Sequence, residues 1–350
     1  MNRVSFAGND YLGLAGDPRP AEAMCRAARE YGVGATSGRS FLGWSDLHEA
    51  LERDLREFSG AESACLLPNA YLGGLLYYRY IAGRCRVVFC DETSHASQFD
   101  GMRAAGLDIR PFEHLNADDL ARLLDQHDAE ADGPAVVATD SVYGISGELA
   151  PLRELADATR KARAELFIDD AHGAFVLGEN GRGAWEQCGL DPDEATVAGS
   201  MSKGLGVTGG FIIGRQEIVE NLKRGPHAIA STPFPPPVAA ACREAVRIVR
   251  AEPELRERMW RNAARMRGIL AEHSIPIVSD QSPVIGMLFE DEFEAAEMAE
   301  HFEARGLVIR YAKYPSEPRH NILRAVARAC YTEEDLARFA AAVAAAPRAG

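Results

Sequence analysis

Long apolar runs are missing from this sequence of 350 residues, and none reaches the roughly 18 residues that a membrane span needs. Positive charge is also scarce, because 38 lysines and arginines stand against 52 aspartates and glutamates, which gives a formal net charge of −14. This balance argues against binding to nucleic acid or to an anionic membrane surface. The first eleven residues lack the basic-then-apolar order of a secretory signal, so we expect a cytoplasmic protein.

Cysteine is sparse, and the positions of the cysteines do not suggest disulfide bonds. The seven cysteines are odd in number and scattered, and no C-x-x-C pair occurs. We therefore expect free thiols in a reducing compartment and no structural metal site. Apolar residues make up 47% and charged residues 26% of the chain, which is typical of a globular protein. The length suggests about two domains.

Short apolar strands and helical stretches alternate through the middle of the chain, which is typical of a mostly parallel sheet covered by helices on both faces. The predicted strands are 86–91, 108–112, 135–140, 166–170, 196–200 and 210–214. Ligands of such sheets bind at the carboxyl ends of the strands. After the prolines at 235–237, one long helical stretch over 238–273 and a mixed pattern of strands and helices predict a smaller α+β domain. We expect an N-terminal segment 1–44, a large domain 45–235 and a small C-terminal domain 236–350.

Polar side chains gather where the predicted strands end. Asp169 follows one strand, and Lys203 follows another within a run of small residues, 199–206. Glycines in such a run let the backbone approach a ligand closely, and a strand end is where a Schiff-base lysine is expected. A carboxylate and a lysine at neighbouring strand ends match what pyridoxal phosphate requires of a protein. Taken singly, each residue also fits a blander role, as a turn cap or a solvated lysine.

The chain as a whole resembles the α-oxoamine synthases, a family of fold type I enzymes that depend on pyridoxal phosphate. Segments in the family's order carry the resemblance over essentially the whole chain: 9–14, 32–43, 95–97, 168–172, 199–206, 231–236 and 323–324. The resemblance implies an α/β fold of the fold type I class, with pyridoxal 5'-phosphate as cofactor. It also implies a homodimer with shared active sites.

The resemblance also implies a role for individual residues. Lys203 resembles the lysine that binds the cofactor and later carries a proton, and Asp169 the carboxylate that keeps the ring nitrogen protonated. His95 is similar to the histidine that stacks on the ring, and His172 to the one that binds the ring 3'-oxygen; either resembles a group that polarises the substrate oxygen. The implied phosphate ligands are Asn69, Ala70, Tyr71 and Ser200, with Ser231 and Thr232 serving the neighbouring subunit. The implied carboxylate ligands are Arg324 and Asn9, with Arg39 as the replacement candidate.

Three positions depart from the family's pattern. Gly144 stands where a serine is usual, Asn69-Ala70-Tyr71 replaces a serine-glycine-aromatic turn, and Ala329–Thr332 replaces a segment with two histidines. These departures bear on the acyl donor more than on the cofactor, because the lysine and the ring carboxylate are both present.

The resemblance implies a decarboxylative condensation of a small α-amino acid with an acyl thioester, on coenzyme A or on an acyl carrier protein, to give an α-amino ketone. An aminotransferase, or another carbon–carbon bond-forming enzyme of specialised metabolism, needs the same Lys203 and Asp169 and stays an alternative. A non-catalytic binding protein on a degenerate enzyme fold is a third hypothesis. The sequence leaves the identity of the amino acid and of the acyl donor open.

Overall fold

The computed structural model describes residues 3–127, 129, 133–226, 229, 231–309, 311 and 317–346. The chain forms two compact units that we describe separately. Unit 1 consists of Met1–Gly13, Val142–Leu149 and Glu252–Gly350. Unit 2 consists of Leu14–Ser141 and Ala150–Ala251. These divisions differ from the expected domains in three respects, two of which concern the N-terminal segment and a loop. The N-terminal segment is shared between the units, and a short loop after residue 141 belongs to the smaller one.

The second boundary lies one helix later than the proline run suggested. Helix α12 (Pro236–Ala251) packs against α1 (Pro18–Tyr31) and α2 (Asp46–Ser59) of unit 2, with a buried face of small and apolar residues. The expected long helix ends there, and α13 (Glu254–Glu272) begins after Pro253. Proline has no N–H to donate to the preceding turn, which explains the break.

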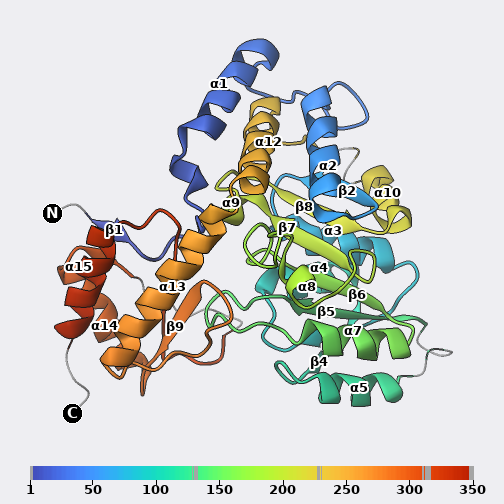
Figure 1. Ribbon diagram of the computed structural model, residues 1–350. Helices are drawn as coiled ribbons and strands as arrows, with labels where there is room; N and C mark the ends of the chain where they lie inside the picture. The colour runs from blue at the N-terminus through green and yellow to red at the C-terminus, as the bar shows by residue number, and fades with distance from the viewer. Residues whose placement is uncertain are drawn as a thin grey trace. The chain divides into compact units, whose positions relative to one another are not determined.

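A seven-stranded sheet forms the centre of unit 2 (Figure 1). Its order is β2-β8-β7-β6-β5-β3-β4, and β8 runs opposite to the other six strands. The predicted mostly parallel sheet is therefore confirmed. The strands are β2 (Ser63–Leu67), β3 (Val87–Asp91), β4 (Asp108–Phe112), β5 (Ala135–Asp140), β6 (Glu165–Asp169), β7 (Thr196–Ser200) and β8 (Gly210–Gly214).

Helices cover both faces of this sheet. On one face, α3 (Tyr71–Ile81), α4 (Ala96–Ala105) and α10 (Gln216–Arg224) share a core with the strands, where Tyr77 stacks on Phe167 at 4.3 Å between ring centroids. On the other face, Phe211 of β8 contacts Phe175, which in turn contacts Phe58 of α2. Helices α5 (Ala117–Asp125) and α7 (Leu152–Lys161) pack together at the far end of the sheet.

Strand β2 and helix α3 were not predicted from the sequence. All five residues of β2 are buried, so the strand shows no alternation of apolar and polar residues. Helix α3 is apolar nearly all round and contains two glycines, which hides its helical period.

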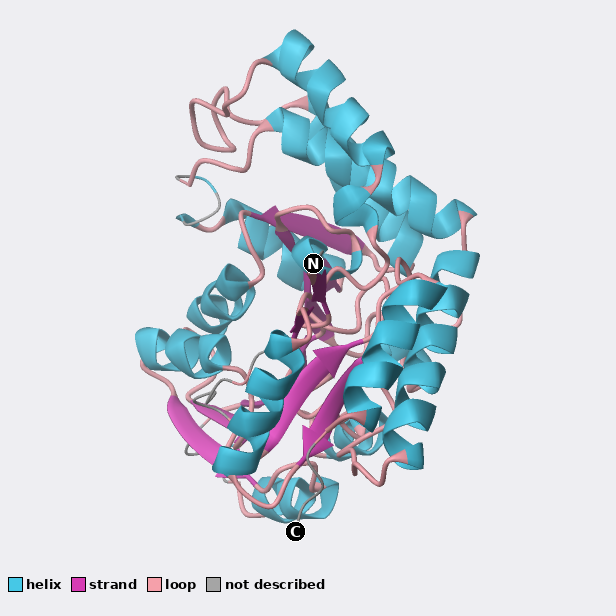
Figure 2. Ribbon diagram, turned by 90° about the vertical axis from the view of Figure 1, so that its left-hand side faces the viewer, coloured by secondary structure: helices cyan, strands magenta, loops and turns pink. Residues whose placement is uncertain are grey.

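Unit 1 is the expected α+β arrangement. Strands β9 (Val284–Leu288) and β11 (Ile322–Val326) pair antiparallel, and β1 (Val4–Ser5) pairs parallel with β10 (Leu307–Val308). Helices α13, α14 (Glu292–Ala304) and α15 (Glu333–Ala344) complete the unit (Figure 2). The apolar stretch 307–312 also predicts a strand, and residues 310 and 312 of it lie outside the described residues. The core is apolar and includes Phe6, Phe302 and Phe339.

Short helical turns also link the larger elements, at η1 (Leu14–Gly16), α8 (Ala184–Gln187) and α9 (Met201–Gly204). Among the described residues, none of the helices has the length and apolar character to span a membrane.

Candidate functional site

The carboxyl ends of β5, β6 and β7 bring polar residues to one edge of the sheet. Asp140 ends β5, Asp169 ends β6, and Ser200 ends β7 just before Lys203. The register pairs Asp140 with Asp169, and Asp169 with Ala198 of β7. Residues that the sequence placed at separate strand ends are therefore neighbours in space.

Asp169 interacts with the charges of both Lys203 and His95 at this edge. Burial raises the pKa of the Asp169 carboxyl, and the positive charges of Lys203 and His95 oppose that rise. The backbone N–H of Ala171 donates a hydrogen bond to Asp169 Oδ1 at 3.0 Å. Burial lowers the pKa of His95, and Lys203 lowers it further while Asp169 raises it. The structure thus brings together Asp169, Lys203 and His95, as the sequence predicted.

Lys203 is positioned by a short turn of helix directly after β7. Ser200 caps this turn, because its side-chain oxygen accepts the N–H of Ser202 at 3.3 Å. Gly204 follows Lys203 and lies very close to the turn after β6. A Cβ at this position would be 2.7 Å from the carbonyl oxygen of Ala174. The glycine therefore lets the lysine-bearing turn pack directly against the turn that follows Asp169.

His95 is held in one orientation and one tautomer. It is the N-cap of α4, and its Nδ1 accepts the backbone N–H of Ser97 at 3.2 Å. The Ser97 hydroxyl also lies 2.7 Å from Nδ1. Since a backbone N–H can only donate, Nδ1 of the neutral ring is unprotonated and Nε2 carries the proton. The imidazole is therefore a hydrogen-bond donor through Nε2.

The turn after β6 carries His172 and is built on Asp170. His172 is half-buried in this turn. The fully buried Asp170 side chain accepts hydrogen bonds from the Ser141 hydroxyl and from the Ala184 N–H, the latter at 3.1 Å to Oδ2. Gly183, with a φ of 140°, lies so close that any Cβ there would clash with this carboxyl. Burial raises the pKa of Asp170 to about 7.

The predicted phosphate turn leads into the N-terminus of α3. Ala70 is the N-cap and offers no side-chain hydrogen bond, while Asn69 Oδ1 accepts the N–H of Leu72 at 3.3 Å. Gly210 of β8 packs against the Asn69–Ala70 backbone, where a side chain would clash. A helix N-terminus of this kind suits an anion. Tyr71, also predicted here, is 47% exposed and donates its hydroxyl to Asp100.

These groups fit pyridoxal phosphate. A buried carboxylate suits the protonated ring nitrogen, a nearby amine suits the aldehyde carbon, and a helix N-terminus suits the phosphate. Within the described ranges, His, Cys, Asp and Glu form no cluster of three or more able to hold a metal ion.

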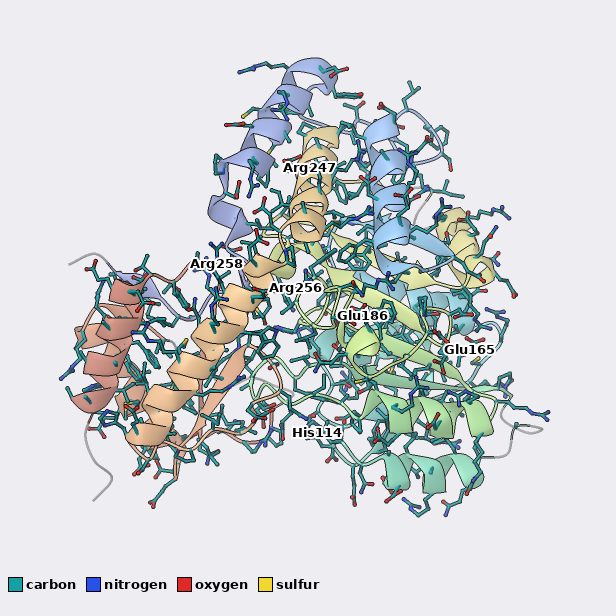
Figure 3. The ribbon with its side chains drawn as sticks, in the orientation of Figure 1. His114, Glu165, Glu186, Arg247, Arg256 and Arg258 are labelled. Carbon is teal, nitrogen blue, oxygen red and sulfur yellow. The ribbon has the colours of Figure 1, made fainter. Side chains whose placement is uncertain are left out.

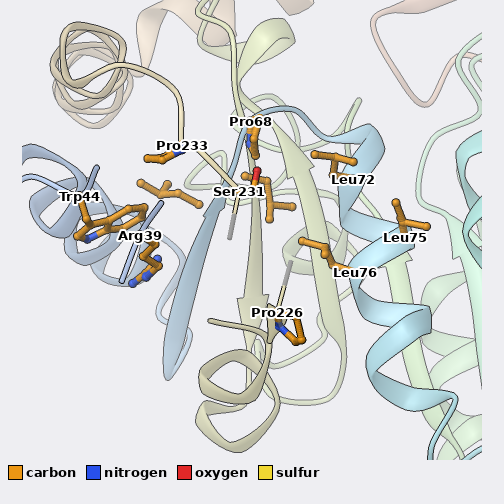
Figure 4. Close-up of a pocket in the computed structure, with 11 residues that line it drawn as sticks. Arg39, Trp44, Pro68, Leu72, Leu75, Leu76, Pro226, Ser231 and Pro233 are labelled. Carbon is orange, nitrogen blue, oxygen red and sulfur yellow. The ribbon is translucent and has the colours of Figure 1, made fainter. Parts of the chain in front are cut away.

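Arg39 and Ser231 line a cavity of about 390 Å³ in unit 2 (Figure 4). Its other walls are mainly apolar: Trp44, Leu66, Leu67, Pro68, Leu72, Leu75, Leu76, Pro226 and Pro233. Arg39 makes two hydrogen bonds to the Glu52 carboxylate, at 2.6 and 2.9 Å, and stacks over Trp44 at 3.7 Å. The fork of this guanidinium is therefore engaged by a carboxylate of the chain itself. Ser231 and Thr232 are exposed.

The predicted carboxylate ligands Arg324 and Asn9 lie together in unit 1. Arg324, on β11, donates to Asn9 Oδ1 at 2.5 Å, to the Ala7 carbonyl at 3.2 Å and to the Gly144 carbonyl. These three acceptors carry no net charge. Burial raises the pKa of the neighbouring Tyr11 to about 12, which the charge of Arg324 opposes.

Sequence reasoning missed Asp140 and Glu52. Asp140 is the last residue of a predicted strand, so the sequence already placed it at the carboxyl edge, where a ligand is expected. The pairing of Glu52 with Arg39 had no local signal, because it joins a helix to a separate loop.

Comparisons with known proteins agree with this site. The family described as aminotransferase class I and II matches residues 2–343. The 8-amino-7-oxononanoate synthase of Symbiobacterium thermophilum is 33% identical over 97% of this chain and 87% of its own length. That of Alkalilimnicola ehrlichii is 36% identical with the same coverage.

Solved structures are similar over nearly the whole chain. A serine palmitoyltransferase from S. paucimobilis, solved with a bound PLP–myriocin adduct, has a TM-score of 0.92 and 28% identity. The match covers 98% of this chain and 88% of that one. An 8-amino-7-oxononanoate synthase from Francisella tularensis, at 21% identity and a TM-score of 0.82, covers 97% of this chain and 96% of its own, and shares the fold. The chain therefore belongs to the class I and II aminotransferase family, as a pyridoxal-phosphate-dependent, acyl-transferring α-oxoamine synthase.

Proposed function

We propose that this enzyme joins a small α-amino acid to an acyl thioester and releases a thiol and CO2. The Cα proton leaves, a bond forms between Cα and the acyl carbonyl carbon, and the carbonyl–sulfur bond breaks to release the thiol with a proton. The bond from Cα to its carboxylate then breaks to release CO2, a proton replaces it on Cα, and the product is an α-amino ketone. The cluster of Asp169, Lys203 and His95 carries this proposal, since it supplies a ring-nitrogen partner, an amine and a donor at one strand edge. The names of the relatives support it, because 8-amino-7-oxononanoate is itself an α-amino ketone.

When bound, pyridoxal phosphate supplies an electron sink for the negative charge that develops at the amino-acid Cα. Asp169 would hold a proton on the ring nitrogen, because a buried carboxylate favours a neighbouring cation. Lys203 would hold the cofactor covalently and then move the Cα proton. The Nε2–H of His95 would donate a hydrogen bond toward the ring face or the substrate oxygen, and His172 would bind the ring 3'-oxygen.

The phosphate would bind at the N-terminus of α3. We assign it to the backbone of Asn69, Ala70 and Tyr71 and to the hydroxyl of Ser200. Backbone N–H groups and hydroxyls are neutral donors, so they bind the phosphate without leaving an unpaired positive charge when the phosphate is absent. The close approach of Gly210 to the Asn69–Ala70 backbone keeps this turn in place.

Arg324, supported by Asn9, is our candidate for the substrate carboxylate. The three acceptors described for Arg324 are neutral oxygens. Arg39 already forms a two-point ion pair with Glu52, and recruiting it for substrate would break that pair. The cost of breaking this pair counts against Arg39.

We propose that two copies of the chain form a homodimer. The loop over 32–44 exposes large apolar side chains, with Phe41 at 71% and Leu42 at 93%, next to the apolar cavity that Trp44 lines. Exposed apolar groups beside an apolar cavity are typical of a surface that a partner covers. The nearby hydroxyls of Ser231 and Thr232 are exposed and would serve the phosphate site of the second copy.

The acyl group would arrive as a thioester of coenzyme A or of an acyl carrier protein, since both present the same thioester chemistry. We place the reaction in the cytoplasm, where the seven cysteines, all free thiols in the structure, stay reduced.

Thiol release by the purified holoenzyme tests the proposal. Glycine, L-alanine and L-serine would each be combined with acyl thioesters of graded chain length, on coenzyme A and on a carrier protein. We expect thiol and CO2 to appear together, and only when both substrates are present. Amine transfer to a keto acid without thiol release would instead identify an aminotransferase. A protein that binds no cofactor and releases no thiol would be the non-catalytic alternative.

A further inference from the structure

Asp140 is a buried carboxyl that stands beside the proposed ring carboxylate. It ends β5, is 7% exposed, and is the direct register partner of Asp169 on the parallel strand β6. Partner residues of adjacent parallel strands point to the same face of the sheet, at about 4.8 Å between strands. The two carboxyl groups therefore leave the same face at the same edge.

Asp140 also ends a buried chain of hydrogen bonds that leads to His95. Asp140 Oδ2 accepts the backbone N–H of His95 at 2.9 Å, and Oδ1 accepts from Gln98 Nε2 at 3.4 Å. Gln98 Oε1 in turn accepts the hydroxyl of Tyr78, at 2.5 Å. Gln98 and Tyr78 are both fully buried. The chain thus runs from α3 through α4 to the end of β5, and fixes the backbone at His95.

The two carboxyls of the pair differ in their surroundings. Burial raises the pKa of Asp140 well above its ordinary value, and the charges of Asp169 and Asp91 raise it further. The described hydrogen bonds to Asp140 come from neutral groups. Asp169, in contrast, faces the positive charges of Lys203 and His95. The hydrogen bonds from the His95 N–H and from Gln98 oppose the rise at Asp140. A carboxyl that faces cations keeps its negative charge more readily than a buried carboxyl that faces other carboxylates.

We propose that Asp140 is a positioning residue of the cofactor site, which fixes the backbone of His95 and acts as the neutral partner in a carboxyl pair whose negative charge resides on Asp169. This inference rests on the proposed roles of His95 and Asp169. It gives Asp140 two separable properties, an acceptor oxygen for the His95 N–H and the absence of charge.

Two variants separate these properties. Asp140→Asn has nearly the same shape, is neutral at every pH and keeps one acceptor oxygen for the His95 N–H, while its amide nitrogen replaces the oxygen that accepts the longer bond from Gln98. Asp140→Ala removes the acceptor and leaves the His95 N–H and the Gln98 amide without this partner. We expect Asp140→Asn to keep kcat within about threefold of the parent. Asp140→Ala should lower kcat roughly ten- to a hundredfold, with KM for the amino acid within about twofold, because a misplaced group costs rate more than binding.

Two further readouts do not depend on turnover. In holoenzyme, Asp140→Ala should speed hydrogen exchange of the peptide that contains His95 by tenfold or more and reduce the circular dichroism of the bound cofactor. Asp140→Asn should leave both near the parent's values.

Asp91→Ala is the matched control. Asp91 is a buried carboxyl at the end of the adjacent strand β3, and its side chain accepts from the N–H groups of Thr93 and Leu115, each at 2.9 Å. It also contacts His114, whose place in the fold is labelled in Figure 3. We expect this variant to melt at a lower temperature and to exchange faster at Leu115, but to keep the cofactor signal and the protection at His95.

The inference fails if Asp140→Ala matches the parent in kcat, exchange and cofactor dichroism, or if Asp91→Ala alters all three to the same extent. It also fails if Asp140→Asn is as impaired as Asp140→Ala, since a neutral acceptor would then not suffice. A parent protein without lysine-bound cofactor would contradict the proposed function instead, which keeps the two failures distinct.

Discussion

Arg324 donates a hydrogen bond to the side-chain oxygen of Asn9, although the two residues lie near opposite ends of the chain. Strand β11 carries the arginine, and the N-terminal segment brings the asparagine to it within unit 1. The carbonyls of Ala7 and Gly144 accept from the same guanidinium. Three segments of the sequence therefore meet at one cation, whose plane is fixed before any substrate binds.

Replacing Arg324 should weaken binding of the amino acid. A guanidinium offers a carboxylate two parallel hydrogen bonds, whereas an ammonium offers a point charge. Arg324→Lys should therefore lose about 2 kcal/mol of binding free energy, or roughly thirtyfold in affinity, and Arg324→Ala should lose more. The change in cofactor absorbance during amino-acid titration measures this. Arg39→Lys is the comparison, and a larger loss there would transfer the carboxylate role to Arg39.

Lys203→Ala should abolish the covalent link to the cofactor. Its position in the turn after β7, close enough for its charge to act on Asp169, makes it our choice among the lysines. The visible absorbance band of the parent should disappear, and borohydride should no longer fix cofactor to the protein. Lys161→Ala, on the exposed end of α7, should keep both properties. A reducible link that persists without Lys203 would remove this lysine from the mechanism.

Asp169→Asn should fold normally but lose most of its turnover. A neutral amide does not stabilise a protonated ring nitrogen, and loss of one such electrostatic partner costs on the order of 10²-fold in rate. Steady-state thiol release with cofactor-loaded protein measures the effect. Turnover near that of the parent, with cofactor bound, would show that another group fulfils this role.

Asp170 should make folding stability depend on pH. Its pKa is raised to about 7 by burial, so the folded state holds a proton that the unfolded chain releases above about pH 4. The stabilisation is complete below pH 4 and is lost as the pH rises through 7. The unfolding free energy of Asp170→Asn minus that of the parent should therefore be about 2–3 kcal/mol larger at pH 8 than at pH 5.

Urea unfolding of parent and Asp170→Asn at the two pH values measures this gain. Subtracting the two proteins removes the contribution of the other titrating groups, because these are shared. An unchanged difference between pH 5 and pH 8 would mean that Asp170 is ionised in the folded protein.

Charged residues in the loop over 32–44 should weaken the proposed dimer. Phe41 and Leu42 are among the most exposed large apolar side chains of the described chain, so placing charge there costs the monomer little. The double change Phe41→Asp and Leu42→Asp should lower the dimer's association constant at least a hundredfold in sedimentation experiments. Phe293→Asp, an equally exposed position in unit 1, is the control. A dimer that withstands the double change would place the interface elsewhere.

Local sequence determined much of the fold and the core of the site. Four strands, at 108–112, 135–140, 196–200 and 210–214, have the predicted bounds, and the last three are short, fully buried runs with turn residues beside them. Asp169 and Lys203 were identifiable for the same reason, since each lies within a few residues of a strand end. The edge at which they meet follows from the rule that parallel strands share their carboxyl ends.

Tertiary structure alone decided which distant residues meet. The pairing of Asp140 with Asp169 depends on strand register, and the engagement of Arg39 by Glu52 depends on how a loop packs on α2. Assignment of Val142–Leu149 to unit 1 rests on contacts such as the hydrogen bond from the Ser282 hydroxyl to the Gly147 carbonyl at 2.8 Å. Local periodicity records which face of an element is buried, but not which partner buries it. Such partners are fixed only when the whole core packs, which is why they were absent from the sequence pattern.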